Sequence, residues 1–156
     1  MSKALFPGSF DPFTSGHLDI LQRALGIFDT VVVAIGVNQD KTGFYTTDQK
    51  IDIIRQATKG LKGVEIIHYE GLTVDACKNL GIHHIVRGVR NFMDFETEQT
   101  NADANRRLYP EVDTLIIPTA QEYSHISSSA VRDIIRHGGD TSTFMPEGVV
   151  LPEINA

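Results

Sequence analysis

Short apolar runs recur along the chain, separated by longer segments in which apolar residues repeat every three or four positions. The runs predict strands at residues 3–6, 30–37, 64–69, 83–86 and 114–117. The second run, TVVVAIGV, is nearly all apolar and rich in β-branched residues, which is typical of a strand buried on both faces of a sheet. We therefore expect helices to cover both sides of it.

The segments between these runs predict helices. Spacing and stop signals place them at residues 18–28, 51–57, 73–80, 91–109 and 127–137. Residues 47–50 (TDQK) resemble a helix cap before the second of them. Gly81, Pro110 and Gly138 each follow a predicted helix, as glycine and proline do where helices stop.

Strands that alternate with helices favour parallel pairing. The pattern predicts an α/β fold: a single domain over residues 1–156 with a Rossmann-like, open, parallel five-stranded sheet and helices on both faces. Open sheets of this kind bind ligands at the carboxyl ends of their strands. Functional residues are therefore expected just after the five apolar runs.

Composition, net charge and cysteine content exclude several classes of protein. The chain has 156 residues, 41% hydrophobic and 22% charged, with a net charge of −6. The negative charge disfavours broad nucleic-acid binding. Its one cysteine, Cys77, excludes an internal disulfide and is expected to be buried on a helix. No apolar run approaches the ~18 residues of a membrane span, and the first residues lack a signal-peptide core, so we expect a cytoplasmic protein.

The segment after the first strand, FPGSFDPFTSGH, carries the strongest candidate chemistry. Gly16 permits close approach of a ligand to the backbone. His17 falls in the first turn of the next helix, where backbone amides attract phosphate, and Ser9 adds a hydroxyl. The alternative is a structural loop with a capping histidine.

Cationic and hydroxyl residues follow other strands. Arg87 and Arg90 flank Gly88 and Val89, and arginine suits phosphate oxygens, although a structural ion pair would use the same residues. Lys41 follows the second strand. It could bind phosphate there, but a lysine on such a loop is usually only a solvated charge. Ser127, Ser128 and Ser129 open the last helix. They would serve equally as caps or as a phosphate cradle, with Arg132 one turn later.

Three motifs together resemble one family. They are TSGH preceded by GSFDP, RGVR followed by DFETE, and ISSS, in this order. The chain resembles the phosphopantetheine adenylyltransferase family of the nucleotidyltransferase superfamily over essentially its whole length. Ser9 replaces the commoner threonine, and Thr97 stands where many members have tyrosine, so Thr97 is left out of the expected site.

The resemblance implies transfer of the adenylyl group of ATP to 4′-phosphopantetheine, giving dephospho-coenzyme A and pyrophosphate. It assigns catalysis to His17, as transition-state stabiliser, with Lys41 and Arg90. The implied acceptor-binding residues are Ser9, Lys41, Thr73 and Arg87. The implied ATP-binding residues are Ser9, Phe10, His17, Gly88, Val89, Arg90, Glu98, Tyr123, Ser124, His125, Ile126, Ser127, Ser128 and Ser129.

The implied mechanism is in-line attack without a covalent intermediate. The acceptor phosphate has a second pKa near ~6, so it needs positioning and charge neutralisation rather than a general base. No metal-ligand spacing is evident, and Mg²⁺ is expected to arrive on the ATP phosphates. The family further implies a homohexamer and feedback inhibition by coenzyme A. The net charge and the lack of a long apolar run predict no nucleic-acid or membrane partner.

Three alternatives remain open. One is a sister adenylyl- or cytidylyltransferase with another acceptor, against which Thr14 and the RGVR…DFETE pattern argue. Another is a nucleotide-binding regulatory module that has lost catalysis, which should show a broken motif. The third is a nucleic-acid binder, which the net charge disfavours.

Overall fold

A computed structural model describes residues 1–154. Its sheet has five parallel strands in the order β3-β2-β1-β4-β5. The strands are β1 (Lys3–Gly8), β2 (Thr30–Gly36), β3 (Val64–Tyr69), β4 (His84–Val89) and β5 (Asp113–Pro118). The helices are α1 (Ser15–Leu25), α2 (Thr47–Ala57), α3 (Thr73–Leu80), α4 (Phe92–Leu108) and α5 (Ser128–Arg136), with a short 3₁₀ turn at Gln121–Tyr123.

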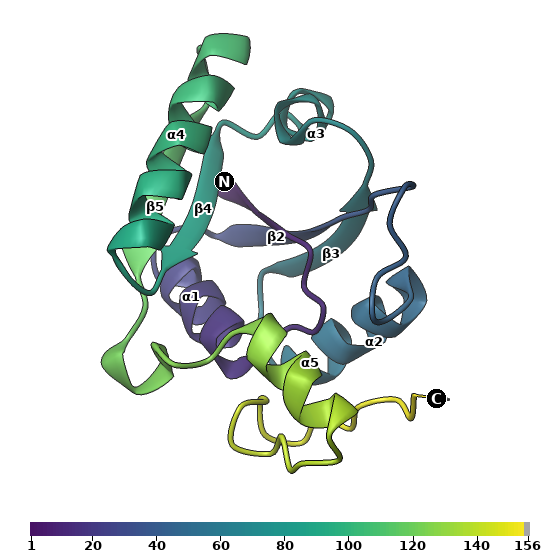
Figure 1. The fold of residues 1–156 in the computed structure, drawn as a ribbon. Coiled ribbons are helices and arrows are strands. Elements are labelled where there is room, and N and C mark those ends of the chain that lie inside the picture. The colour runs from purple at the N-terminus through teal and green to yellow at the C-terminus, as the bar shows by residue number, and fades with distance from the viewer. Residues whose placement is uncertain (155–156) are drawn as a thin grey trace.

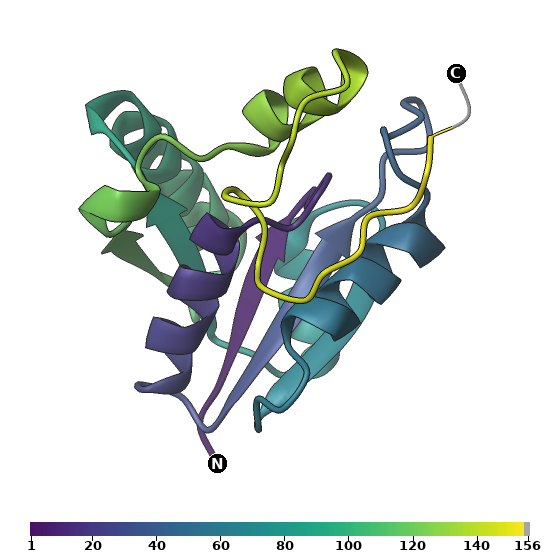
Figure 2. The ribbon, with the colours of Figure 1, turned by 90° about the horizontal axis from the view of Figure 1, so that it is seen from below.

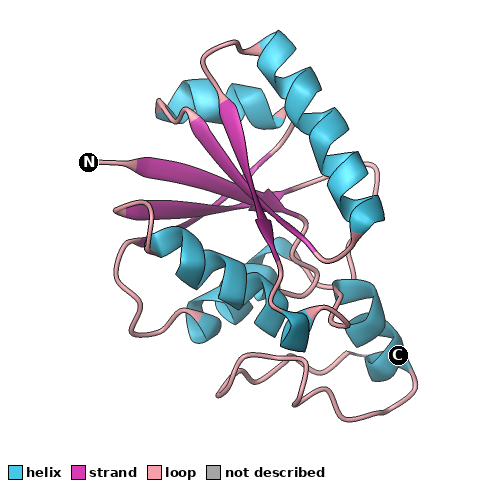
Figure 3. Ribbon diagram, turned by 90° about the vertical axis from the view of Figure 1, so that its left-hand side faces the viewer, coloured by secondary structure: helices cyan, strands magenta, loops and turns pink. Residues whose placement is uncertain are grey.

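Helices lie on both faces of this sheet (Figures 1 and 3). One apolar cluster joins alternate residues of β1 and β2, such as Phe6 and Val33, to α1, α2 and α5. The other joins the opposite side chains, such as Leu5 and Val32, to α3. The expected α/β architecture is confirmed, and β2 is buried on both sides as its composition predicted.

Cys77 belongs to the second cluster and is fully buried on α3, as expected. Burial raises the pKa of its thiol to about 11. The thiolate is the reactive form of cysteine, so this residue is an apolar packing group. Among residues 1–154, no helix is both long and apolar enough to cross a membrane.

Strand ends differ from the predicted ones in a way that matters for the site. β1 continues two residues beyond Phe6, through Gly8, because Pro7 and Gly8 still pair in register with β2. β4 was predicted to end at Val86 but continues to Val89, paired with β5. The prediction that Arg87 and Gly88 follow the strand is therefore wrong: both lie within it.

Helix starts are set by local caps. Thr14 caps α1, and Ser127 caps α5 by accepting a hydrogen bond from Ala130. The cap of α2 is Thr46, one residue before the predicted segment, with Gln49 closing a capping box. Threonine followed three residues later by glutamine satisfies two amides that the helix leaves free, which accounts for the shift.

Candidate active site

A cleft of about 340 Å³ opens at the carboxyl ends of β1 and β4. The first turns of α1 and α5 face into it from two sides, and Figure 2 shows α5 beyond the strand ends. Predicted residues that line it are Ser9, Phe10, His17, Gly88, Arg90, Glu98, Ile126, Ser127, Ser128 and Ser129, together with Arg87 and Arg132. Segments far apart in sequence therefore meet at one site, as the fold predicted.

His17 is oriented by its own helix cap. The backbone N–H of Thr14 donates to Nδ1 of His17 at 2.9 Å, and the Thr14 hydroxyl lies 3.2 Å from the same nitrogen. An Nδ1 that accepts a hydrogen bond places the ring proton on Nε2. The cap thereby selects the tautomer whose free nitrogen is a donor.

The charge of His17 is set by its surroundings. Burial, together with the positive charges of Arg87 and Arg90, lowers its pKa to about 4. The rings of Phe10 and Phe13 lie 5.0 and 5.4 Å from the imidazole, between centroids. His17 is therefore neutral at physiological pH and offers an Nε2–H donor.

Two positions beside His17 depend on close packing. Phe10 is only 2% exposed, with a positive φ of 45°, and it forms part of the packed wall of the cleft. Gly88 faces Ile20 of α1, and a Cβ at this position would lie 2.8 Å from Cγ1 of Ile20. Because real Cβ contacts are not this short, glycine lets α1 approach β4.

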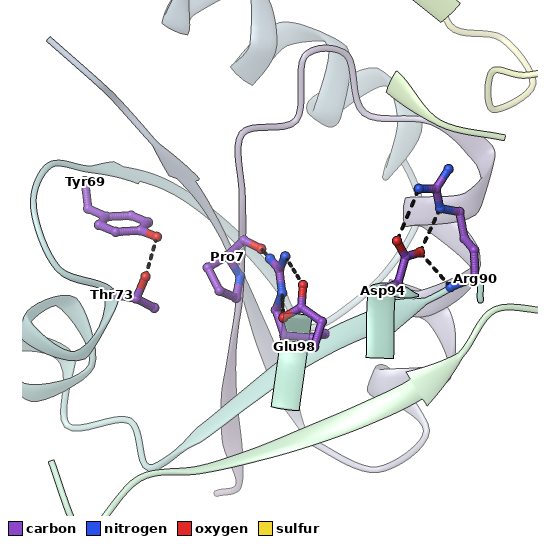
Figure 4. A network of polar contacts seen from close by, with 7 residues as sticks. Pro7, Tyr69, Thr73, Arg90, Asp94 and Glu98 are labelled. Atoms are coloured by element: carbon purple, nitrogen blue, oxygen red, sulfur yellow. Dashed lines mark hydrogen bonds and ion pairs between the residues drawn. The ribbon is translucent and has the colours of Figure 1, made fainter. Parts of the chain in front are cut away.

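Arg87 is held by an ion pair and a backbone contact. Its Nε and Nη2 donate to the two carboxylate oxygens of Glu98 on α4, at 2.8 and 2.6 Å. Nη1 donates to the backbone oxygen of Pro7 on β1 (Figure 4). A two-point arginine–carboxylate pair fixes orientation as well as charge, so the guanidinium is rigidly placed between β1 and α4. Glu98 was predicted to bind ATP, and here its carboxylate is engaged by Arg87.

Arg90 lies at the rim, just after β4. Its Nε and its backbone N–H both donate to the carboxylate of Asp94 at 3.0 Å. Burial acts to raise the pKa of Asp94, but the hydrogen bonds from Arg90 outweigh it and hold that pKa below its usual value. The ion pairs that the sequence left open as an alternative therefore exist, and both arginines also line the cleft.

The three serines at the start of α5 differ in what they contact. Ser127 Oγ accepts from the Ala130 N–H at 3.1 Å, and Ser128 Oγ donates to the Pro12 oxygen at 2.8 Å. Arg132 donates to Ser129 Oγ at 3.2 Å and to the Asp11 backbone oxygen at 2.8 Å. Ser127 therefore acts as the cap, and a phosphate cradle remains compatible with this arrangement because all three serines line the cleft at a helix N-terminus.

A second cavity, of about 490 Å³, lies on the other side of Arg87. It is lined by two of the predicted acceptor residues besides Arg87, namely Ser9 and Thr73. Thr73 Oγ1 lies 2.9 Å from the Tyr69 hydroxyl. Tyr69, Asn101 and Asn105 also line this cavity and were not predicted. Tyr69 ends β3, and the two asparagines lie on α4, which shows no clear apolar periodicity that would say which side chains face inward.

Lys41 lies in neither cavity. It is exposed on the loop of residues 37–46 and lines an adjoining basin that shares Ser9 and Arg132 with the cleft. Four further predicted residues do not line the cleft: Val89 is buried, the Ser124 hydroxyl donates to Gln121, His125 packs on Phe144, and Tyr123 ends the 3₁₀ turn. The exposed Thr97 also lies outside it, as expected.

The carboxylates around the cleft do not form a metal cage. Among residues 1–154, no three His, Cys, Asp or Glu side chains are grouped to hold a metal ion. Asp94 and Glu98 each face an arginine. The donor set of the cleft is thus cationic and hydroxylic, which suits phosphate oxygens.

Comparison with known proteins agrees with this chemistry. The cytidylyltransferase-like family model matches residues 5–134. Phosphopantetheine adenylyltransferase of Flavobacterium psychrophilum is 48% identical over 96% of this chain and 98% of its own length. That of Porphyromonas gingivalis is 47% identical over 95% and 96%, and that of Oenococcus oeni 45% over 96% and 95%.

A solved structure shares the fold. The bifunctional NMN adenylyltransferase/ADP ribose pyrophosphatase of Francisella tularensis matches 94% of this chain with a TM-score of 0.74 and 19% identity. The chain spans 45% of that protein's length. At this identity the match supports the architecture alone.

Proposed function

This chain belongs to the phosphopantetheine adenylyltransferases, within the cytidylyltransferase-like family, and we propose that it transfers the adenylyl group of ATP to 4′-phosphopantetheine. The products are dephospho-coenzyme A and pyrophosphate. One observation carries the proposal: the cleft and the second cavity share Ser9, Arg87 and Glu98 in their walls. Two ligands bound side by side would meet at these residues.

In this proposal His17 stabilises the transition state. Its Nε2–H donates to an oxygen of the α-phosphate, where negative charge builds up during attack. A neutral donor suits this task because its proton is not titrated near pH 7. Preorganised donors of this kind cost no rearrangement at the moment of reaction.

The acceptor's phosphate attacks directly. Its second pKa is near ~6, so it is largely ionised at neutral pH and needs no base. Arg87, rigidly paired with Glu98, and Lys41 from the adjoining loop offset its charge as it nears ATP. Ser9 stands in the walls of both cavities and bridges the two substrates.

The leaving pyrophosphate is held at the opposite end of the cleft. Arg90, the serines at the start of α5 and Arg132 supply cations and donors there. The α5 N-terminus adds its positive dipole end. With the acceptor phosphate near Ser9 and Arg87, the attacking phosphate and the leaving pyrophosphate would lie on opposite sides of the α-phosphate, as in-line displacement requires.

Magnesium would enter with ATP. Phosphate oxygens are among its preferred ligands, and it is seldom caged by protein alone. The residues of the cleft would bind the remaining phosphate oxygens. We further propose a cytoplasmic homohexamer that coenzyme A inhibits by occupying both cavities, with no nucleic-acid or membrane partner.

The test is pyrophosphate release from ATP and magnesium with different acceptors. We expect turnover with 4′-phosphopantetheine and little with nicotinamide mononucleotide. His17→Ala should lower kcat by about 10²–10³, the cost of losing one such donor. His83→Ala is the matched control, because His83 is 51% exposed and lies outside both cavities.

Each outcome separates the alternatives. Turnover with nicotinamide mononucleotide alone would keep the nucleotidyltransferase chemistry and refute the proposed acceptor. Binding of ATP without turnover of either acceptor would favour a regulatory module. Equal losses in His17→Ala and His83→Ala would refute the role of His17.

A further inference from the structure

We propose that Asp11 is a positioning residue for the acceptor phosphate, acting through the loop that carries Lys41. The proposal rests on the function proposed above, in which Lys41 offsets the charge of the acceptor phosphate. Asp11 belongs to the GSFDP segment, and its side chain has no place in the mechanism so far. The residue is nonetheless buried, only 9% exposed, and it contacts both the Lys41 loop and α5.

The carboxylate binds the Lys41 loop directly. Asp11 Oδ2 accepts from the backbone N–H of Phe44 at 2.8 Å, and Oδ1 accepts from that of Tyr45 at 2.9 Å. These contacts bridge 33 and 34 residues of sequence. A carboxylate has two acceptor oxygens and no donor, so one side chain fastens two consecutive loop amides.

Elsewhere the loop is anchored at its two ends. The Val37 N–H donates to the Tyr69 oxygen at 2.8 Å, and the Tyr45 side chain is buried in the apolar core. The polar contacts of the stretch between them are local or exposed. Lys41 itself makes a turn contact, from its backbone N–H to the Asn38 oxygen at 3.2 Å. Gln39 reaches Glu70 through an exposed hydrogen bond of 2.7 Å. Exposed contacts contribute little because water competes for them, whereas a buried charge-assisted pair is worth more. Asp11 is therefore the main polar constraint on the backbone of this loop.

The loop is shaped to close over the carboxylate. A Cβ at Gly43 would lie 3.3 Å from Asp11 Oδ2 and 3.0 Å from the Tyr45 oxygen. Lys50, buried at 8% exposure, has its Nζ beside the same point, 3.2 Å from that Cβ position. A glycine and a buried cation thus accompany the buried anion.

The same short segment also fixes the far end of the cleft. The Asp11 backbone oxygen accepts from Arg132, and the Pro12 oxygen accepts from Ser128. These contacts use backbone atoms, which a change of the Asp11 side chain leaves in place. The side chain therefore serves the acceptor side, and the backbone serves the α5 side.

This division gives a specific test with Asp11→Asn. The amide keeps one oxygen for one loop N–H but turns an NH₂ group toward the other. We expect the KM for the acceptor to rise about tenfold, the effect of roughly one charge-assisted hydrogen bond. We expect the KM for ATP to change by less than about threefold, because the backbone contacts remain.

A double-mutant cycle shows whether Asp11 acts through Lys41. In a Lys41→Ala background, Asp11→Asn should have little further effect on the acceptor KM, because coupled residues are not additive. Gly43→Ala should reproduce the acceptor-specific rise with Asp11 intact. Gln39→Ala, which removes the exposed anchor, is the control and should stay within about twofold of wild type.

Amide hydrogen exchange tests the contact without any turnover. Asp11→Asn should lose protection at Phe44 and Tyr45 while β1 and β2 keep theirs. Unchanged protection at both amides would refute the proposal even if no acceptor is turned over. Equal rises in both KM values, or additive effects in the Lys41 cycle, would also refute it, since each indicates a general structural role.

Discussion

His17 and Arg87 face the same cleft, but they are positioned in opposite ways. The ring of His17 is set by Thr14, only three residues earlier, within one capping box. Arg87 is set by Glu98, eleven residues later on another element, and by Pro7, eighty residues earlier on a neighbouring strand. The orientation of the His17 ring is set within a single turn of chain, whereas that of Arg87 is set only once β1, β4 and α4 have packed.

The difference separates chemistry that a motif encodes from chemistry that a fold assembles. Within TSGH, the spacing from threonine to histidine is the spacing of a capping box. Within RGVR…DFETE, the Arg87–Glu98 ion pair forms only when α4 packs against β4. Changes at Arg87 should therefore affect stability and binding together, whereas changes at Thr14 should remain local.

The largest effect is expected from Arg87→Met. It leaves the carboxylate of Glu98, with its side chain only 11% exposed, without its partner. We expect the free energy of unfolding to fall by about 3 kcal/mol, measured in urea, with weaker acceptor binding. Arg106→Met is the control, because the Arg106–Asp113 pair is exposed and such pairs contribute about 0–1 kcal/mol.

A second change sharpens this prediction. Arg87→Met combined with Glu98→Leu should recover most of the stability, since an apolar pair can replace a buried ion pair. Acceptor binding should stay weak. If stability and binding recover together, or if Arg87→Met costs no more than Arg106→Met, the pair does not organise this side of the site.

An intermediate effect is expected from pH, through His17. Its pKa is about 4 in the folded protein and 6.5 ordinarily, so the unfolded chain binds the proton more tightly. Its contribution to stability is therefore present above pH 6.5 and is lost as pH falls through about 4. The total loss is at most roughly 3 kcal/mol.

The measurement is urea unfolding of wild type and His17→Gln across this range of pH. As pH falls from 6.5 to about 4, the free energy of unfolding of the wild type should decrease relative to that of His17→Gln. The His17 ring should also keep the chemical shifts of its neutral form by NMR down to about pH 5. A titration near the ordinary value would contradict the proposed neutral donor.

The smallest effect is expected from Thr14→Ala. Loss of the cap hydroxyl should cost about 1 kcal/mol. The backbone N–H of residue 14 still reaches Nδ1 of His17, so kcat should fall by less than about tenfold. Thr46→Ala removes the equivalent hydroxyl at the start of α2 and should cost similar stability with kcat unchanged. A kcat loss as large as that of His17→Ala would show that the hydroxyl orients the ring.

Much of the fold could be predicted because its signals are local. The apolar run of β2 and the stop at Gly81 needed no knowledge of neighbours. The end of β4 could not be predicted, because Arg87 is polar and Gly88 is a poor strand former. Their place in the strand comes from pairing with β5, across which Arg87 opposes Ile116.

The site divides along the same line. His17, the Ser127 cap and the RGVR segment were identified from residue type and spacing. Lys41 was predicted to hold the acceptor phosphate with Arg87. The structure places it in an adjoining basin, on a loop whose Phe44 N–H donates to Asp11. Tyr69, Asn101 and Asn105 were missed because polar residues on a strand end and a polar helix look like solvated surface.

The sequence by itself determined where strands and helices follow one another along the chain, how the helices are capped and which groups are able to bind phosphate. These depend on contacts within a few residues, where chain geometry leaves few choices. Only the tertiary structure decided the strand order β3-β2-β1-β4-β5, the pairing of Arg87 with Glu98 and the fastening of the Lys41 loop by Asp11. Those contacts join residues that only packing of the whole core brings within hydrogen-bond distance.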